Sequence, residues 1–523
     1  MKKVVLAGLA VLSMGCAGVC APLRGPETWL ELMGGDVRLD GLTCDLEAMK
    51  GAGITGVHFF HIFRDIQMGY RNETLHPACT EPMPAYGPKW EKMMNHIGSE
   101  CRRLGLKLTV QNCPGWSQSG GPWIDLDHCQ REVTCARADF AAGAKVTLPE
   151  IPKHYADRDS DWRDIAVFAF PTPEGDVGEA RLEPAEVIKA GDSRVFRFKE
   201  PVTVRAVVLP ALNSFNSRHA YDRPWLHVKL EANGKTVLDT DLPISNWRDY
   251  VRSLTLACEE TTAKEFRYTL THRFPLRKFL EPTLSSSARL YNWEGKGGFT
   301  LRSMERRPQP KQSASAWVDP AKLVVLTDRV KDGRLDWTAP GGIWTVLRIG
   351  SVNPKYVNAP APEATTGWEC DKLDPKGIEA NFNGYIGKLA EGPLKGLIGG
   401  MLVDSWECFT QTWTPKMEQY FREANGYELR PHLPEIFGYI LGDPEKAERF
   451  LTDWRRTLGD LVTKNYFGRM AELAHAKDLT VLYETAFGEN IYGDMLEYWK
   501  YADEPMCEFW FPHVSREEGL VGT

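Results

Sequence analysis

The feature that most constrains the fold is a short apolar run, residues 397–403, which ends directly in the acid-rich sequence DSWE at residues 404–407. The run is too short for a helix and follows a Gly-Pro break at 392–393, which is typical of a parallel strand buried on both faces. Parallel barrels carry their chemistry where the strands end. Carboxylates move protons and an indole face stacks on a pyranose, so this cluster indicates sugar cleavage. The alternative is that Asp404 caps a helix and Trp406 belongs to the core.

The same pattern occurs twice more downstream. Residues 479–483 form an apolar run that ends in Glu484, and residues 504–510 interleave apolar side chains with Glu508. Glycoside hydrolysis needs one carboxylic acid to protonate the leaving oxygen and one carboxylate to activate water or attack the sugar. We therefore expect Glu407, Glu484 and Glu508 to be catalytic. Each acid taken alone is more often a cap or an ion-pair partner, and it is their recurrence at the same structural position that favours catalysis; their separation cannot be read from the sequence.

Helical and strand patterns alternate on both sides of a central region. Helix-then-strand patterns cover residues 41–60 and 90–111, and helical patterns resume at 380–389, 416–424 and 445–477. Alternation of this kind predicts the α/β class and a (β/α)8-type barrel, of which five or six strands can be counted. We therefore expect the barrel to be incomplete here, either as a fragment or with its closure in sequence that is not shown.

The central region has a different periodicity. From about residue 142 apolar and polar residues alternate, and Asn233-Gly234 separates two such runs, which predicts a hairpin with a type I′ turn. We predict an all-β sandwich inserted into the barrel. The expected divisions are a signal peptide at 1–21, barrel at 22–140, the inserted sandwich at 141–340 and barrel again at 341–523.

The N-terminus has the features of a targeting segment. Two lysines at positions 2 and 3 precede an apolar run, residues 4–14, and small residues follow to position 21. This is the pattern of a signal peptide and predicts a periplasmic or secreted protein. Lipid attachment at Cys16 is the less favoured alternative. No later segment is apolar for the length that a membrane span requires.

Composition excludes some partners and favours others. The net charge of −7 over 523 residues argues against nucleic acid, and 17 tryptophans favour aromatic-lined clefts of the kind that bind carbohydrate. Ten of the 12 cysteines lie beyond the predicted signal peptide, and none forms a CxxC pair. A zinc ribbon or redox motif is therefore not expected. Several of these cysteines lie in apolar strand or helix patterns and are expected to be buried thiols; an exported protein could oxidise one or two pairs, which the sequence does not identify.

A second candidate binding segment follows the predicted strand at 106–111. Residues 112–123 contain Asn112, Trp116 and Trp123 among several Gly, Ser and Pro residues. Stiff turn formers with two indoles and an amide indicate a binding loop, although a plain Pro/Gly turn is the alternative.

Several of these motifs together resemble glycoside hydrolase family 106, the bacterial α-L-rhamnosidases. The matching segments are residues 41–56, 111–123, 368–373, 404–407 and 413–415. The resemblance implies a (β/α) barrel with added β-domains, an inverting mechanism, Glu407 as general acid, and either Glu508 or Glu484 as base. It also implies that the chain acts on rhamnose-containing polysaccharides or glycosides.

The same resemblance implies a calcium ion that holds sugar hydroxyls. Calcium takes six to eight oxygen ligands, and the expected contributors are Glu484, Glu508, Asp371 and Asn112. We expect substrate contacts from Asn112, Trp116, Trp123, Asp371, Asp404 and Trp406. The alternatives are a barrel glycosidase for another sugar, and a sugar-binding protein without turnover.

Overall fold

The computed structural model describes residues 25–35, 37–62, 83–116, 119–212, 226–244, 249, 251–272, 278–304, 307–484 and 493–507. The predicted signal peptide and Glu508 lie outside these residues.

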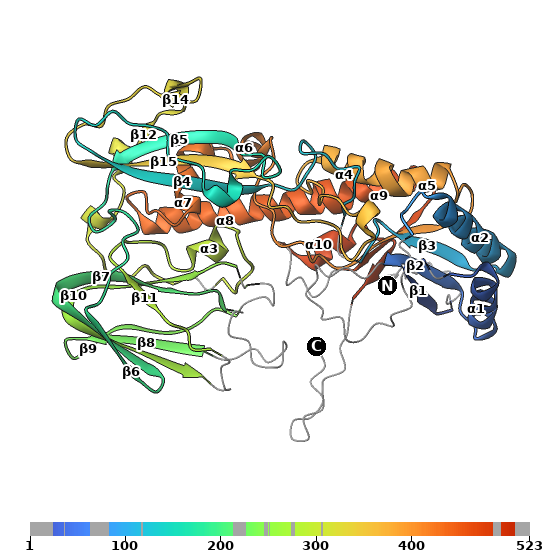
Figure 1. Ribbon diagram of the computed structural model, residues 1–523, viewed down its shortest axis with the longest axis horizontal. Coiled ribbons are helices and arrows are strands. Elements are labelled where there is room, and N and C mark those ends of the chain that lie inside the picture. The colour runs from blue at the N-terminus through green and yellow to red at the C-terminus, as the bar shows by residue number, and fades with distance from the viewer. Residues whose placement is uncertain are drawn as a thin grey trace, which may run out of the picture.

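Six parallel strands form the first sheet, and they are hydrogen-bonded in the order in which they occur along the chain. They are β1 (Glu27–Met33), β2 (Gly56–Ile62), β3 (Lys107–Gln111), β16 (Gly400–Val403), β17 (Thr480–Glu484) and β18 (Glu504–Met506). The sheet curls as half of a barrel (Figure 1). The predicted α/β class and parallel strands are therefore confirmed, whereas a complete (β/α)8 barrel is not formed by the described residues.

Helices cover the outer face of this sheet. They include α1 (Leu39–Gly51), α2 (Pro88–Leu104), α4 (Pro375–Phe382) and α5 (Lys388–Glu391). Helix α2 begins at a proline and ends before Gly105, whose φ of +65° suits glycine. Because side chains alternate along a strand, Phe59 and Val110 face these helices in the main core, whereas Phe60 and Leu402 belong to a separate apolar cluster. The second cluster marks the inner face of the half-barrel.

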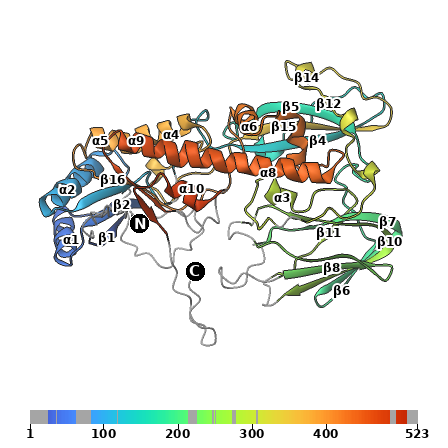
Figure 2. The same cartoon turned by 180° about the vertical axis from the view of Figure 1, so that it is seen from behind.

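One long helical rod connects the two ends of the molecule. Helix α8 (Pro444–Leu461) continues through a π-helical turn, Val462–Gly468, into α9 (Arg469–His475). The rod runs along the long axis from the antiparallel sheets to the parallel sheet (Figures 1 and 2). Trp454, fully buried on α8, donates from Nε1 to the carbonyl of Gly297 at 2.9 Å. Shorter helices complete the set: α3 (Trp293–Lys296), α6 (Met417–Asn425), α7 (Leu433–Ile436) and α10 (Met495–Trp499).

The region between β3 and β16 is antiparallel, as its alternating pattern predicts. A six-stranded sheet contains β6 (Glu186–Ala190), β7 (Ser193–Leu209), β8 (Leu226–Ala232), β9 (Lys235–Asp241), β10 (Leu254–His272) and β11 (Thr283–Ser285). A four-stranded sheet contains β4 (Glu132–Ala141), β5 (Arg163–Pro171), β12 (Val324–Val325) and β15 (Ile343–Val352). Strands β13 (Val330–Lys331) and β14 (Arg334–Leu335) form a small hairpin. The predicted turn at Asn233-Gly234 joins β8 and β9 with positive φ at both residues.

These antiparallel sheets have separate cores. The six-stranded sheet has its own apolar cluster. One face of the four-stranded sheet contributes Phe168 and Leu347 to the main core, and its other face contributes Val167 and Val346 to a third cluster. The region therefore contains two antiparallel sheets with separate apolar clusters, which confirms its predicted all-β character; its packing as one sandwich stays a prediction.

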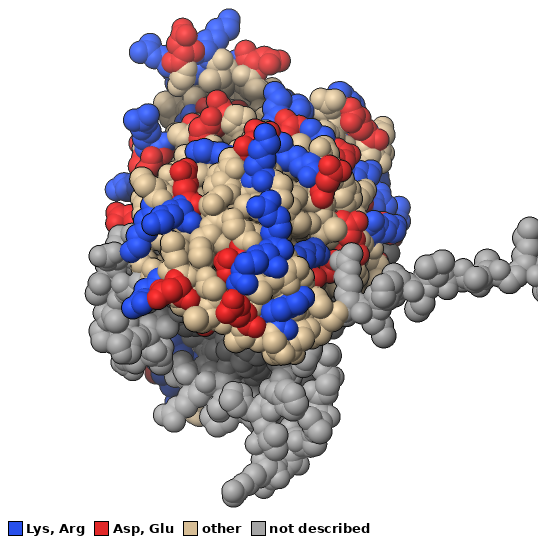
Figure 3. All heavy atoms as spheres, turned by 90° about the vertical axis from the view of Figure 1, so that its right-hand side faces the viewer, with Lys and Arg blue, Asp and Glu red and all other residues tan. Residues whose placement is uncertain are grey.

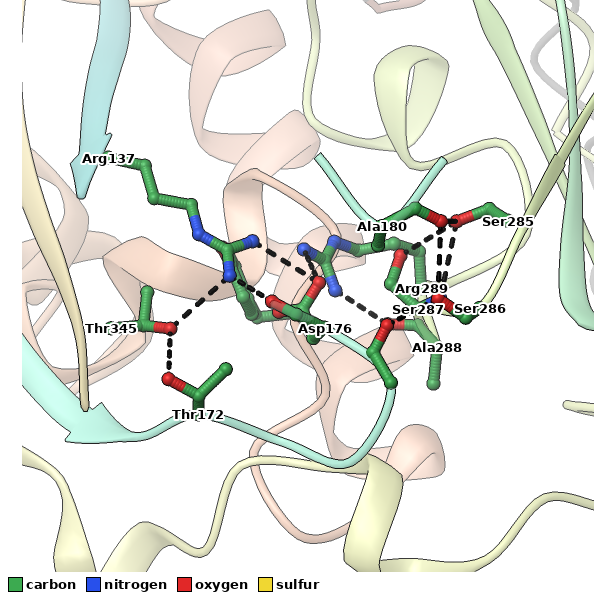
Figure 4. Close-up of polar contacts among 12 residues, drawn as sticks. Arg137, Thr172, Asp176, Ala180, Ser285, Ser286, Ser287, Ala288, Arg289 and Thr345 are labelled. Carbon is green, nitrogen blue, oxygen red and sulfur yellow. Dashed lines mark hydrogen bonds and ion pairs between the residues drawn. The ribbon is translucent and has the colours of Figure 1, made fainter. Parts of the chain in front are cut away.

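A buried ion cluster joins the two antiparallel sheets. Asp176 is fully buried, and its Oδ1 accepts from Arg137 at 3.2 Å and from Arg289 at 2.9 Å (Figure 4). Arg137 lies on β4, whereas Arg289 follows β11 of the six-stranded sheet. Arg137 also binds Asp139, so two guanidinium groups face two carboxylates. A paired cluster of this kind fixes the orientation of one sheet against the other.

The outer surface carries charges of both signs. On the face shown in Figure 3, lysines and arginines are intermixed with acidic residues. Exposed ion pairs such as Arg103 with Glu47 and Glu100 contribute to this mixture. Across the described residues, no helix combines the length and apolarity needed to span a bilayer.

Candidate active site

The ends of neighbouring parallel strands bring three polar side chains to one face. Leu402 of β16 lies opposite both Gln111 of β3 and Leu482 of β17. Residues two apart point to the same face, so Asp404 and Glu484 continue the inner face on which Gln111 lies. The backbone N–H of Asp404 donates to Gln111 Oε1 at 3.3 Å. All three polar side chains are at most 5% exposed.

Two of the three predicted catalytic acids can be placed. Glu484 ends β17 and lies opposite Met506 of β18. Glu407 follows Asp404 by three residues, is partly exposed, and accepts from Ser405 Oγ at 3.3 Å. Glu508 lies outside the described residues. The structure therefore locates Asp404 and Glu484 on adjacent strand ends, with Glu407 on the loop that leaves β16.

The loop carrying Glu407 is held in one shape by its aromatic residues. Phe409 has a φ of +60°, a left-handed conformation that bulky residues rarely adopt. Its carbonyl accepts from Trp406 Nε1 at 2.5 Å, and its ring stacks on Tyr356 with centroids 4.4 Å apart. Unusual backbone of this kind persists only where surrounding contacts enforce it.

The three predicted sugar-binding tryptophans have different environments. Trp406 is 3% exposed; Tyr466 packs edge-to-face against it, and Lys372 Nζ lies 5.2 Å from its ring centre. Trp123 is half-buried and stacks on Tyr385 at 5.5 Å. Trp116 is also half-buried, but it packs on the inner-face apolar cluster. Of the three, Trp116 lies on the same face as the strand-end acids.

Asn112 lies one residue beyond Gln111 and is fully buried. Its Oδ1 accepts from Ser119 Oγ at 2.8 Å and from Asn381 Nδ2 at 3.1 Å, while its own Nδ2 has no partner among the described residues. The following turn requires glycine at Gly115, where φ is +94° and a Cβ would come within 2.7 Å of a backbone oxygen. Asn112 therefore fixes the loop after β3 from inside.

Asp371 is buried and fully occupied by protein donors. Its oxygens accept from the N–H groups of Leu373 and Asp374, from Gln411 Nε2 at 2.6 Å and from Thr414 Oγ1 at 2.6 Å. Burial raises the pKa of Asp371 to about 6. The side chain anchors the segment that follows the Glu407 loop.

A buried network that sequence reasoning did not identify supports the same loop. Lys372 Nζ binds Glu369 Oε2 at 2.7 Å and Gln130 Oε1 at 3.3 Å. Gln130 Nε2 in turn donates to the carbonyls of Cys408 and Thr410, at 3.1 and 3.3 Å. The sequence carries one sign of this network. Two residues of opposite charge, Glu369 and Lys372, lie within residues 368–373, one of the segments that resemble the family.

The network also reaches the loop after β3. Glu369 Oε2 accepts from the backbone N–H of Ser119 at 3.2 Å, and Ser119 Oγ donates to Asn112. Residues 368–373 thus hold the two strand-end loops, after β3 and after β16, in a fixed relation. Within the described residues, no group of three or more His, Cys, Asp or Glu side chains is placed to hold a metal ion.

The comparisons with known proteins agree with this arrangement. The family described as alpha-L-rhamnosidase, glycoside hydrolase family 106, matches residues 23–520. The solved structure of a rhamnosidase from Novosphingobium sp. PP1Y superposes with a TM-score of 0.74 at 27% identity, over 95% of this chain and 49% of that one. A curated protein of Formosa agariphila, provisionally named a beta-glucuronidase, is 25% identical over 92% of this chain and 31% of its own length.

The chain thus spans about a third of the curated relative and about half of the solved rhamnosidase. The family match nevertheless extends across nearly all of the chain, including the strand-end acids and the network that supports them. The chain belongs to glycoside hydrolase family 106, the alpha-L-rhamnosidase family.

Proposed function

We propose that this protein is an exported α-L-rhamnosidase that releases terminal rhamnosyl groups from polysaccharides or glycosides with inversion. The observation that carries the proposal is the placement of Asp404 and Glu484 on one face at adjacent strand ends, with Glu407 on the loop beside them. Carboxylates from separate strands around one barrel mouth are the groups that glycoside hydrolysis needs.

In the proposed reaction Glu407 is the general acid. Its proton goes to the glycosidic oxygen as the bond to the anomeric carbon breaks, and a water molecule attacks that carbon from the opposite face. The base that takes the proton of this water is Glu508 or Glu484, so the product has the inverted configuration. Glu407 is partly exposed, which suits a group that must meet substrate.

The remaining predicted residues divide by their surroundings. Asp404, on the inner face at the end of β16, and Trp116, half-buried on that face, are proposed to contact the sugar. Trp406, Trp123 and Asp371 are packed against protein groups, and we assign them to holding the loops in place. Asn112 is fully buried and bonded to Ser119 and to Asn381 of α4, so we assign it to holding the loop after β3.

For the calcium ion implied by the family, we propose fewer ligands than the four residues expected from the sequence. Asp371 does not fit a calcium site, because its oxygens accept four protein hydrogen bonds. Asn112 Oδ1 already accepts two. Glu484, a carboxylate at the strand ends, fits the oxygen preference of calcium. We therefore propose Glu484 together with Glu508, and calcium there would supply positive charge for sugar hydroxyls.

A panel of aryl glycosides tests the proposed activity. We expect release from an aryl α-L-rhamnoside, with little release from aryl glycosides of other neutral or deoxy sugars or from an aryl β-glucuronide, the substrate class suggested by the name of the Formosa relative. Proton NMR of the first product formed should show the β anomer of rhamnose. Retained α configuration would contradict inversion, and rhamnose binding by calorimetry without any release would favour a binding protein.

Export is tested separately by the N-terminal sequence of the mature protein, which we expect to begin after the first 17 or 21 residues.

A further inference from the structure

Two buried cysteines face each other across a short antiparallel pairing. Cys129 lies just before β4 and Cys370 lies in the segment 368–373, and the two form an isolated bridge. The neighbouring bonds are from Asp371 N to His128 O at 2.7 Å and from Gln130 N to Glu369 O at 2.8 Å. Neither cysteine uses its own N–H or C=O in this bridge, which makes the pair a non-hydrogen-bonded one.

This position is the one at which antiparallel strands come closest. In a non-hydrogen-bonded pair the Cα atoms are about 4.5 Å apart and both side chains lie on the same face. A disulfide spans Cα separations of roughly 4.4–6.8 Å and needs Cβ atoms about 3.5–4.5 Å apart. The two thiols therefore need little backbone movement to join.

We propose that Cys129 and Cys370 form a disulfide when the chain folds in oxidising surroundings. The bond would close a loop that contains the whole antiparallel region, from β4 to β15. Cys129 directly precedes Gln130 and Cys370 directly follows Glu369. The bond would therefore also reinforce the network behind the Glu407 loop. The proposal does not depend on the glycosidase reaction.

The chemistry is an exchange with a small disulfide such as oxidised glutathione. The thiolate of one cysteine attacks a sulfur of the oxidant, which forms a mixed disulfide and releases one thiol. The thiolate of the second cysteine then attacks the protein sulfur of this mixed disulfide and releases the second thiol. Two protein thiols become one disulfide and two protons, and the oxidant is reduced by two electrons to two thiols. Both cysteines are at most 1% exposed, and burial raises the pKa of each to about 12. Native protein should therefore react slowly, and closure should accompany folding.

Peptide mapping of the whole chain tests the proposal directly. The protein is refolded with a glutathione redox couple, alkylated under denaturing conditions without reductant and digested. We expect a peptide pair linked through Cys129 and Cys370 that disappears on reduction. Alkylation of both cysteines in this sample, or a link from Cys370 to the buried Cys113, would overturn the proposal.

Melting temperatures give an independent readout. Oxidised wild type should melt about 5–15 °C above reduced wild type, since disulfides that close long loops stabilise most. Cys129→Ala and Cys370→Ala should each abolish this difference. Cys258→Ala, which removes a buried thiol from the six-stranded sheet, should retain it. If the difference persists in both pair variants, the proposal is wrong; if either variant fails to fold, the mapping of wild type decides.

Discussion

Lys372 Nζ lies 2.7 Å from Glu369 Oε2, and both side chains are completely buried. This ion pair stands between the loop after β3, through Ser119, and the loop after β16, through Gln130. The position of Glu407 thus depends on charges that do not themselves reach the substrate.

Replacing Lys372 by methionine should destabilise the protein by about 3–5 kcal/mol, because Glu369 would keep a buried charge without its partner. Urea unfolding measures this change in the free energy of unfolding. Arg449→Met, which breaks an exposed pair with Glu445 on α8, is the matched control and should cost less than about 1 kcal/mol. Equal losses of unfolding free energy in the two variants would show that the buried ion pair contributes no more to stability than the exposed one.

Asp371 should make stability depend on pH in a defined direction. Burial raises its pKa to about 6 from an ordinary value of 3.8, so the folded state holds the proton more tightly than the unfolded state does. The resulting contribution is fully present below pH 4 and is lost as pH rises through 6. It amounts to about 3 kcal/mol, taking 1.4 kcal/mol for each pKa unit.

The Asp371→Asn variant removes this titration. The difference in unfolding free energy, wild type minus variant, should therefore fall between pH 4 and pH 7 and be flat above pH 7. Denaturant titrations at each pH measure it. A difference that rises over the same interval would mean that the carboxylate form is the favoured one in the folded protein.

Calcium should raise the melting temperature if Glu484 helps to hold the ion. We expect a rise in calcium chloride that is absent in magnesium chloride, and that Glu484→Gln loses. Glu423→Gln, on the exposed side of α6, should respond like wild type. An equal calcium response in the Glu484 variant would remove Glu484 from the ion site, whatever the activity.

Most of the parallel strands were predictable because burial on both faces leaves a visible apolar run, but β1 (Glu27–Met33), which contains two acidic residues, was not predicted. Glu484 ends β17 as predicted. The run at 397–403 gave a strand that was too long, since Leu397 N bonds to Leu394 O in a turn and β16 starts only at Gly400. A short apolar run shows that a strand exists but does not fix its first residue.

The surroundings of the site residues were not predictable in the same way. Local sequence placed Trp406 near a strand end and the family resemblance pointed to Asp371, but their burial depends on distant partners such as Tyr466 and Thr414. The division of the antiparallel region also escaped prediction. Ile343 of β15 pairs with Ala141 of β4, at the other end of the inserted region. The alternation of apolar and polar residues along one strand does not show which strand it pairs with.

The most direct test of the account compares two leaving groups in Glu407→Gln. A general acid is needed most when the leaving oxygen is basic, so kcat/KM for an unactivated rhamnoside should fall about 10³-fold. For a dinitrophenyl rhamnoside, whose leaving group needs little protonation, the fall should stay within about 10-fold, and Glu423→Gln should match wild type on both substrates. Equal losses on the two substrates, or near-normal turnover of the unactivated one, would contradict the assignment of Glu407 as the acid.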